Sequence, residues 1–312
     1  MTMRSVSQAD PAVHSIDHFA LEVPDLADAE RFYTAFGLGV TRHGNEIALR
    51  AHGQDHVWAR AVQGRAKRLA YVCFNCFEQA FPALQAKIEG SCAAPAYVSP
   101  RHSDGVWAFD GDRNLVQVRV GPKTMPDSPS AQSRSSRKIA GERGVSAGRQ
   151  QSVPVRPRRL SHVLLFTPDV DTQVRFYKDV LGLRLSDRAG DIIAFLHAVH
   201  GSDHHLMAFA KSSGPGWHHS SWDVAGVEEV GLGWMQMQAA GYTKGWGLGR
   251  HVLGSNYFCY VQDPWGSFCE YSSDIDFVPA GHQWAAGDHP AEDALYLWGP
   301  PPPAEFTTNT EA

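Results

Sequence analysis

Residues that can bind a metal ion are concentrated in the second half of the chain. Ten of its 16 histidines lie after position 160. Most histidines in proteins are packing or surface residues, so this count alone predicts little. Position is more informative, because His162 and His219 each lie on the first predicted strand of a unit, and Glu270 lies on a last strand. Two histidines and one carboxylate on one face, with open coordination positions, form the facial triad typical of non-haem Fe(II) sites.

The elements that must position these residues follow from the spacing of apolar side chains. Helical spacing from Val170 to Leu181 predicts an amphipathic helix that ends before Gly182, and a second helix is expected from Val227 to Met237. Apolar runs predict the strands of this half at 160–166, 192–196, 206–209, 219–224, 256–261 and 268–271.

The two halves of the chain repeat each other. The segment IDHFALEVPDL at 16–26 matches LSHVLLFTPDV at 160–170, an offset of 144 positions, and RFY at 31–33 matches RFY at 175–177. Such a repeat predicts a duplicated domain of the α+β class. The expected divisions are an extension at 1–14, one copy at 15–120, a Ser/Arg-rich linker at 121–157, a second copy at 158–275 and a tail at 276–312.

Four segments of the second copy carry a resemblance to a known family. They are SHVLLF at 161–166, HHLMAF at 204–209, WHHSSW at 217–222 and the run from 249 to 271, in which Tyr260 follows His251 by nine residues and Glu270 follows Tyr260 by ten. The second copy resembles the catalytic domain of the type I extradiol, ring-cleaving catechol dioxygenases of the vicinal oxygen chelate superfamily. The resemblance implies two homologous domains, each of two βαβββ modules that form a cupped mixed sheet around the site.

The resemblance also implies roles for individual residues. The metal ligands would be His162, His219 and Glu270, holding Fe(II), or Mn(II), with O₂ as co-substrate. His219 is chosen over His218 because it matches the family pattern, and because neighbouring residues of a strand alternate between faces, so that only one of the two could face the site. The catalytic residues would be His205, as acid and base, with His251 and Tyr260 contacting substrate oxygens. The candidates for substrate contact are His204, Trp217 and Trp246.

The first copy serves as an internal control. Alignment places His18, Tyr71 and Gln117 where the second copy has His162, His219 and Glu270. Since tyrosine and glutamine are poor replacements for a histidine and a carboxylate as Fe(II) ligands, we expect this copy to be metal-free and structural.

Composition limits the remaining functions. A chain of 312 residues with 43% hydrophobic residues and a net charge of −5 describes a globular protein, with no signature of nucleic-acid binding. No apolar run approaches the roughly 18 residues that a membrane span needs, and no signal peptide is recognised, so a cytoplasmic location is expected. Between 121 and 160, nine basic residues face two acidic ones, so this linker either lies on the acidic folded parts or stays disordered.

The resemblance therefore implies an enzyme that cleaves a substituted catechol with O₂ to a muconic-semialdehyde-type product in aromatic catabolism, as a homo-oligomer acting on a small molecule. The alternatives are a hydroquinone-cleaving dioxygenase, a glyoxalase-type isomerase, and a non-catalytic module that binds aromatic compounds or drugs. For the Pro-rich tail, two interpretations stay open: it packs beside the mouth of the site, or it merely covers the sheet.

Overall fold

The computed structural model describes residues 5–91, 95, 104–131 and 148–312, so the middle of the predicted linker lies outside the described residues. The first copy forms a seven-stranded sheet in the order β2-β3-β4-β1-β5-β7-β6. Two helices accompany it, α1 (Leu26–Ala35) and α2 (Phe81–Ser91). Its strands are β1 (Ser15–Val23), β2 (Gly39–His43), β3 (Glu46–Arg50), β4 (Val57–Gln63), β5 (Arg68–Cys76), β6 (Val106–Phe109) and β7 (Leu115–Val120).

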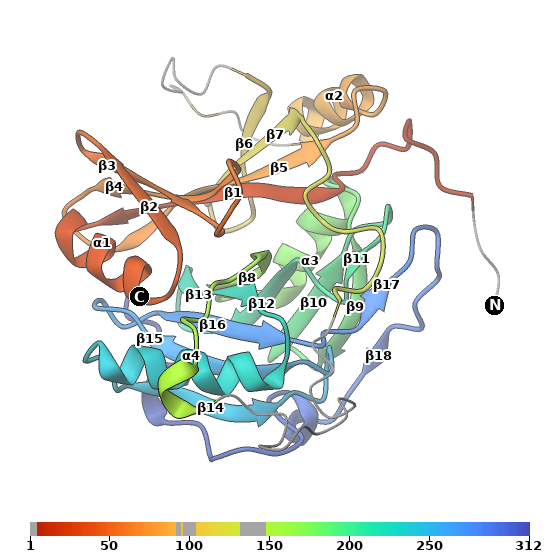
Figure 1. The fold of residues 1–312 in the computed structure, drawn as a ribbon. Coiled ribbons are helices and arrows are strands. Elements are labelled where there is room, and N and C mark those ends of the chain that lie inside the picture. The colour runs from red at the N-terminus through yellow and green to blue at the C-terminus, as the bar shows by residue number, and fades with distance from the viewer. Residues whose placement is uncertain (1–4, 92–94, 96–103, 132–147) are drawn as a thin grey trace.

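The second copy and the tail form a nine-stranded sheet in the order β14-β15-β16-β13-β8-β12-β10-β9-β18 (Figure 1). Its helices are α3 (Val170–Asp179) and α4 (Val227–Ala239). Its strands are β8 (Arg159–Thr167), β9 (Arg184–Ala189), β10 (Ile193–His197), β12 (Met207–Lys211), β13 (Gly216–Asp223), β14 (Gly245–Arg250), β15 (Tyr257–Gln262), β16 (Phe268–Ser273) and β18 (Gly287–Asp288). A small separate sheet pairs β11 (Ser202–Asp203) with β17 (Phe277–Val278). The short helices η3 (Arg149–Gln151), η4 (Ala291–Asp293) and η5 (Ala304–Thr307) complete the elements.

Strand pairing confirms the duplication and the α+β class. β1 pairs in parallel with β4 and antiparallel with β5, just as β8 pairs in parallel with β12 and antiparallel with β13. The parallel pairs β5–β7 and β13–β16 correspond in the same way. The predicted helix that ends before Gly182 is confirmed, as is the one that begins at Val227.

Equivalent residues begin and end the first helix of each copy. Asp25 and Asp169 are the N-caps of α1 and α3. The Asp25 carboxylate accepts the backbone N–H groups of Ala27 and Asp28, and that of Asp169 accepts the N–H of Thr172, an interaction worth about 1 kcal/mol. Gly37 and Gly182 follow these helices with positive φ angles of 97° and 79°, a conformation that glycine adopts without strain.

The two copies share one hydrophobic core. The rings of Phe36 and Tyr271 stack with centroids 3.9 Å apart, and the Tyr271 hydroxyl donates to the Phe36 carbonyl at 2.8 Å. Phe19 packs against Trp217 with centroids 4.6 Å apart. Because aromatic residues bury large apolar areas, these contacts join the two sheets into one packed unit.

The ends of the linker lie on the folded parts. The Thr124 hydroxyl donates to the Ile16 carbonyl at 2.6 Å, and the side chains of Met125 and Val155 are buried in the shared core. The tail leaves the second copy and returns along it, with β18 pairing in parallel with β9 at the sheet edge. In the part of the chain that the structure describes, none of the helices has both the length and the apolar character of a membrane span.

Candidate metal centre and active site

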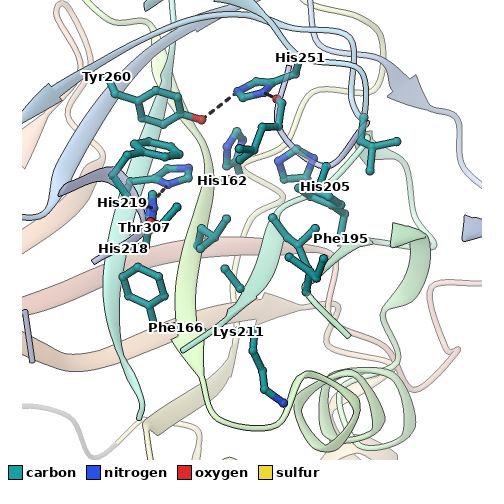
Figure 2. A pocket seen from close by; sticks show the side chains of 18 of the residues that line it. His162, Phe166, Phe195, His205, Lys211, His218, His219, His251, Tyr260 and Thr307 are labelled. Atoms are coloured by element: carbon teal, nitrogen blue, oxygen red, sulfur yellow. Dashed lines mark hydrogen bonds between the residues drawn. The ribbon is translucent and has the colours of Figure 1, made fainter. Parts of the chain in front are cut away.

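Three side chains from three strands meet at one point of the nine-stranded sheet. His162 comes from β8, His219 from β13 and Glu270 from β16, and one potential ligand atom of each lies within 4.8 Å of the others. The His162 Nε2 and His219 Nε2 atoms lie 3.3 Å and 3.7 Å from Glu270 Oε2. The register explains the meeting, because His219 pairs with Leu164, two residues from His162, and Glu270 pairs with Ser221. All three side chains are buried, and Figure 2 shows both rings at the cavity.

The atoms of this cluster suit a divalent cation. His219 Nε2 and Glu270 Oε2 are buried and have no hydrogen-bond partner among the described residues. Burial by itself would raise the pKa of the Glu270 carboxyl, but its interactions with the nearby rings of His162 and His251 outweigh it and hold the pKa below its usual value. Burial, together with the neighbouring His218, keeps the pKa of His219 well below its usual value. Two neutral imidazoles and one carboxylate form a donor set that fits Fe(II) or Mn(II).

The adjacent residues His218 and His219 both line the cavity, so the expected alternation of faces is wrong here. The register between β13 and β8 shifts between Trp217 and His219, which makes His218 the extra residue of a β-bulge. A bulge breaks the alternation of side chains and re-aims them, which sequence patterns do not reveal. The two residues still differ in their contacts, since His218 Nε2 lies 2.8 Å from the Phe306 carbonyl oxygen, while His219 Nε2 faces Glu270.

The structure places His251 and Tyr260 beside Glu270. His251 Nε2 and the Tyr260 hydroxyl are 2.9 Å apart (Figure 2), and His251 Nε2 lies 3.8 Å from Glu270 Oε1. His251 Nδ1 contacts the Leu295 carbonyl, which can only accept, so Nδ1 carries a hydrogen and a neutral ring accepts at Nε2 from the Tyr260 hydroxyl. Burial, with the nearby Glu270 carboxylate, raises the pKa of Tyr260 well above its usual value, so its O–H is retained.

His205 lies at the other side of His162, with ring centroids 4.1 Å apart. Burial, followed by the neighbouring His162, lowers the pKa of His205 well below its usual value. Its Nδ1 lies 3.0 Å from Nδ1 of His204, and His204 Nε2 in turn bonds Asp187 Oδ2 at 2.8 Å. His204 therefore links the His205 ring to the Asp187 carboxylate.

None of the three residues expected to contact substrate is part of the cavity lining. His204 is fully buried against Asp187. Trp217 packs between the two sheets, with the Lys67 ammonium 5.9 Å from its ring. Trp246 stacks behind Tyr260 at 5.6 Å, and its indole N–H donates to the Pro300 carbonyl at 2.8 Å. These positions correct the sequence-based expectation in favour of a packing role, as is common for large aromatic side chains near a sheet.

One residue that the sequence did not single out also lies at the site. The Asn256 side-chain amide donates to Glu270 Oε1 at 3.1 Å and to the Ser272 hydroxyl at 2.9 Å. It thereby holds the carboxylate oxygen that faces away from the two histidines. No spacing in the sequence connects an asparagine at the start of a strand with this role.

The cavity itself has apolar walls and polar groups at one end. On β8, Leu164 and Phe166 follow His162 on the same face, as the period of two requires. The tail supplies a further wall, which confirms the interpretation that it packs beside the site. The space between the lining atoms is about 920 Å³ including the open mouth. The remaining apolar lining residues are Ile192, Ile193, Phe195, Ala210, Leu253, Ala291, Ala294, Leu295 and Phe306.

In the first copy, the equivalent positions bond to one another or to neighbouring groups. Ala20 pairs with Tyr71 and Cys73 with Gln117, which is the same register as in the second copy. His18 Nε2 lies 3.0 Å from the Tyr71 hydroxyl, and the Gln117 amide donates to the Asp104 carbonyl at 2.7 Å. Asp17, His18 and Cys73 do lie close enough to hold an ion. However, Asp17 already bonds His18 and Arg119, at 2.6 Å and 3.0 Å, so the absence of a metal here stays a prediction.

Comparison with known proteins places this site in a family. Residues 159–271 match the family model of the Glyoxalase/Bleomycin resistance protein/Dioxygenase superfamily. The chain is 59% identical over 303 residues to Metapyrocatechase 2 of Cupriavidus necator, covering 96% of this chain and 93% of that protein.

Two solved structures share the fold. The 2,2',3-trihydroxybiphenyl 1,2-dioxygenase of Sphingomonas wittichii superposes with a TM-score of 0.69 at 20% identity, covering 92% of this chain and 99% of that one. The Mn(II)-bound glyoxalase of Novosphingobium aromaticivorans gives 0.74 at 24%, covering 95% of each chain. The fold, the strand register and the identity over nearly the whole length together show that the chain belongs to the extradiol dioxygenase family of the vicinal oxygen chelate superfamily.

Proposed function

We propose that this protein cleaves the ring of a substituted catechol with O₂ at a mononuclear Fe(II) centre. One observation carries the proposal: three potential metal donors lie together at one end of a cavity with apolar walls, which two of them and three further polar side chains line. The donors are His162, His219 and Glu270, and the polar side chains are His205, His251 and Tyr260. A fold that only bound a metal would need the first set and not the second.

The donor set determines what the metal would contribute. Two imidazole nitrogens and one carboxylate oxygen suit Fe(II), and Mn(II) accepts the same donors. When bound, the ion supplies adjacent coordination positions at which both catechol oxygens and O₂ are held together. The orphaned Nε2 of His219 and Oε2 of Glu270 are the atoms that support this assignment.

His205 is positioned to move the proton. Its ring lies 4.1 Å from that of His162 and faces the cavity, so it is next to any hydroxyl bound at the donor set. A neutral imidazole accepts the hydroxyl proton of the catechol at its free nitrogen and returns it to an oxygen that gains charge during cleavage. This proton transfer gives His205 the role of general base and then general acid.

Tyr260 and His251 act on the opposite side of the cluster. Their mutual contact of 2.9 Å orients the phenol, whose hydroxyl can turn from His251 to a substrate oxygen. Hydrogen bonds aimed at oxygens that gain charge in the transition state are a large term in catalysis. The apolar walls limit water at the ring, so that O₂ rather than water reaches it, and the expected product is of the muconic-semialdehyde type.

Oxygen uptake tests the reaction. Protein purified without oxygen and loaded with Fe(II) is given a panel of substituted catechols and hydroquinones while the product spectrum is recorded. We expect one O₂ consumed per catechol, with a yellow, pH-sensitive product. Uptake with hydroquinones alone would move the protein to the alternative ring-cleaving class, and no uptake despite bound iron would refute the proposal.

Metal analysis tests the donor set separately. Glu270→Ala and His219→Ala should abolish stoichiometric iron binding, because each removes one of only three protein ligands. Gln117→Ala is the matched control, since it occupies the equivalent register position in the first copy. Unchanged iron content in the first two variants would contradict the site.

A further inference from the structure

The bulge in β13 brings the two neighbouring histidine rings into contact. His218 Nδ1 and His219 Nδ1 are 2.6 Å apart (Figure 2), a distance that requires one hydrogen between the two nitrogens. In a regular strand without a bulge, side chains alternate, and the ring at 218 would point away from the cavity that His219 faces. The bulge therefore places the His218 ring against Nδ1 of His219, which is a proposed metal ligand.

The other end of the His218 ring is held by the C-terminal tail. Nε2 of His218 lies 2.8 Å from the backbone carbonyl oxygen of Phe306, in the helix η5. The Phe306 side chain is itself buried, and its ring lies 4.5 Å from Trp246 and 4.7 Å from Tyr260. This aromatic packing fixes the carbonyl in place.

The hydrogen positions along this chain of atoms follow from the carbonyl. A carbonyl oxygen only accepts, so Nε2 of His218 carries the hydrogen. His218 is buried and forms no ion pair with a carboxylate among the residues described, and an unpaired buried charge is costly, so its ring is neutral and Nδ1 is an acceptor. The hydrogen between the rings therefore belongs to Nδ1 of His219. Nε2 of His219, which faces Glu270, is then left with a free lone pair.

We propose that His218 is a positioning residue that links the Phe306 carbonyl of the tail to His219. Through these two hydrogen bonds it holds His219 in the tautomer that can bind metal. The inference rests on the metal centre proposed above. Histidines that bind metals usually donate their other N–H to a fixed partner, and loss of that partner commonly weakens metal binding 10- to 100-fold. Here the partner is tied to a segment outside the duplicated domain. The factor by which a docked tail strengthens metal binding therefore equals the factor by which bound metal strengthens docking of the tail.

The other proposed histidine ligand is supported by side chains of the second copy alone. Ser161 is the bulge residue of β8, its hydroxyl donates to Asp203 Oδ2 at 2.7 Å, and it lies 3.3 Å from Nδ1 of His162. Asp203 is part of the second copy. Each proposed histidine ligand thus has a bulge residue beside its Nδ1 atom, but of these two bulge residues only His218 bonds the tail through its side chain.

The first test reads the tautomer directly in the metal-free protein. With ¹⁵N-labelled histidine, the long-range nitrogen–proton spectrum distinguishes Nδ1–H from Nε2–H rings, and the variant His219→Gln assigns the signal. We expect His219 in the Nδ1–H form, which is the minor one for a free imidazole. An Nε2–H form of His219 in the wild-type protein would overturn the proposal, and this measurement needs no variant of His218.

The second test uses Co(II) and Mn(II) in competition with a chelator. His218→Phe keeps an aromatic ring among Phe166, Phe268 and Phe306 but removes both nitrogens, and should weaken metal binding 10- to 100-fold. His218→Gln offers one donor and one acceptor and should recover most of the affinity. Wild-type affinity in His218→Phe would refute the role of His218.

The third test concerns the tail. Metal binding should slow amide hydrogen exchange at 304–308 in the wild-type protein and should not do so in His218→Phe. Equal slowing in both proteins would show that the coupling does not pass through His218. None of these readouts measures ring cleavage, so a protein with the expected tautomer and metal affinity but without oxygen uptake would contradict the proposed function and not this inference.

Discussion

A buried ion pair near the proposed metal ligand His162 makes a sharp prediction about stability. Arg159 and Asp203 form two parallel hydrogen bonds, Nη1 to Oδ2 at 2.8 Å and Nη2 to Oδ1 at 3.0 Å, and both side chains are almost completely buried. Asp203 also accepts the Ser161 hydroxyl. Asp203→Ala would leave the guanidinium buried without this partner and would release the serine behind His162.

The size of the effect follows from what remains around Arg159. Removing one partner of a buried pair typically costs about 3–5 kcal/mol, because the other charge stays desolvated. Asp223 lies 3.8 Å from Arg159 Nε and compensates in part, although it also pairs with Arg158 at 2.8 Å. We therefore expect the lower end of that range, about 3 kcal/mol of unfolding free energy.

Urea unfolding of the metal-free protein measures this difference. Asp191→Ala is the matched control, since its pair with Lys211 at 3.5 Å is exposed and such pairs contribute at most about 1 kcal/mol. The double variant Arg159→Met/Asp203→Leu should recover much of the lost stability, because it removes both charges together. A loss below about 1 kcal/mol in Asp203→Ala would refute the reasoning that the pair is desolvated.

Two further predictions concern a buried carboxyl and the phenol of the site. Burial raises the pKa of Asp110 to about 6, with hydrogen bonds from Asn114 opposing the shift. The folded state thus binds this proton more tightly than the unfolded state, so its contribution, about 3 kcal/mol, is complete below pH 4 and is lost as the pH rises through 6. Asp110→Asn should remove this part of the pH dependence of urea unfolding between pH 4 and 7, and an unchanged slope would contradict the shift. Tyr260→Phe should lower kcat by about 10²- to 10³-fold with iron content unchanged, measured by oxygen uptake, and an equal loss of iron would instead assign the residue to the metal site.

The sequence predicted the strands that carry the proposed site well, because apolar runs mark them in the chain. The apolar runs placed His162 on β8 and located β13 and β16 within a few residues, and the 144-residue offset predicted the duplicated domain. The strands β9 (Arg184–Ala189) and β14 (Gly245–Arg250) were not predicted individually. The first contains two arginines and an aspartate, and the second contains three glycines, so neither shows an apolar pattern.

The failures at the site have local causes. The alternation argument for His218 and His219 did not hold, because a β-bulge adds one residue and nothing in the composition of 216–223 marks it. Trp217 and Trp246 were candidates for substrate contact, yet both pack in the interior, one between the sheets and one behind Tyr260. Sequence spacing identifies which residues lie near the site, but it does not show whether their side chains line the cavity or pack behind it.

The first copy shares the strand frame of the proposed metal centre but not its donor types. Tyr71 and Gln117 occupy the register positions of His219 and Glu270, and there they bond His18 and Asp104. Even the bulge is repeated, because the register of β5 against β1 shifts at the position equivalent to His218, where the residue is Ala70.

What distinguishes the second copy is therefore the donor types together with a segment that the repeat does not contain. The tail brings two backbone carbonyls, of Leu295 and Phe306, to His251 and His218. Each carbonyl fixes which nitrogen of its histidine carries a hydrogen, and so determines that the other nitrogen, which faces the proposed centre, is an acceptor. Because the tail has no counterpart in the first copy, comparison of the two halves could not predict this contribution. The proposed active site is thus completed by residues far outside the motifs that predicted it.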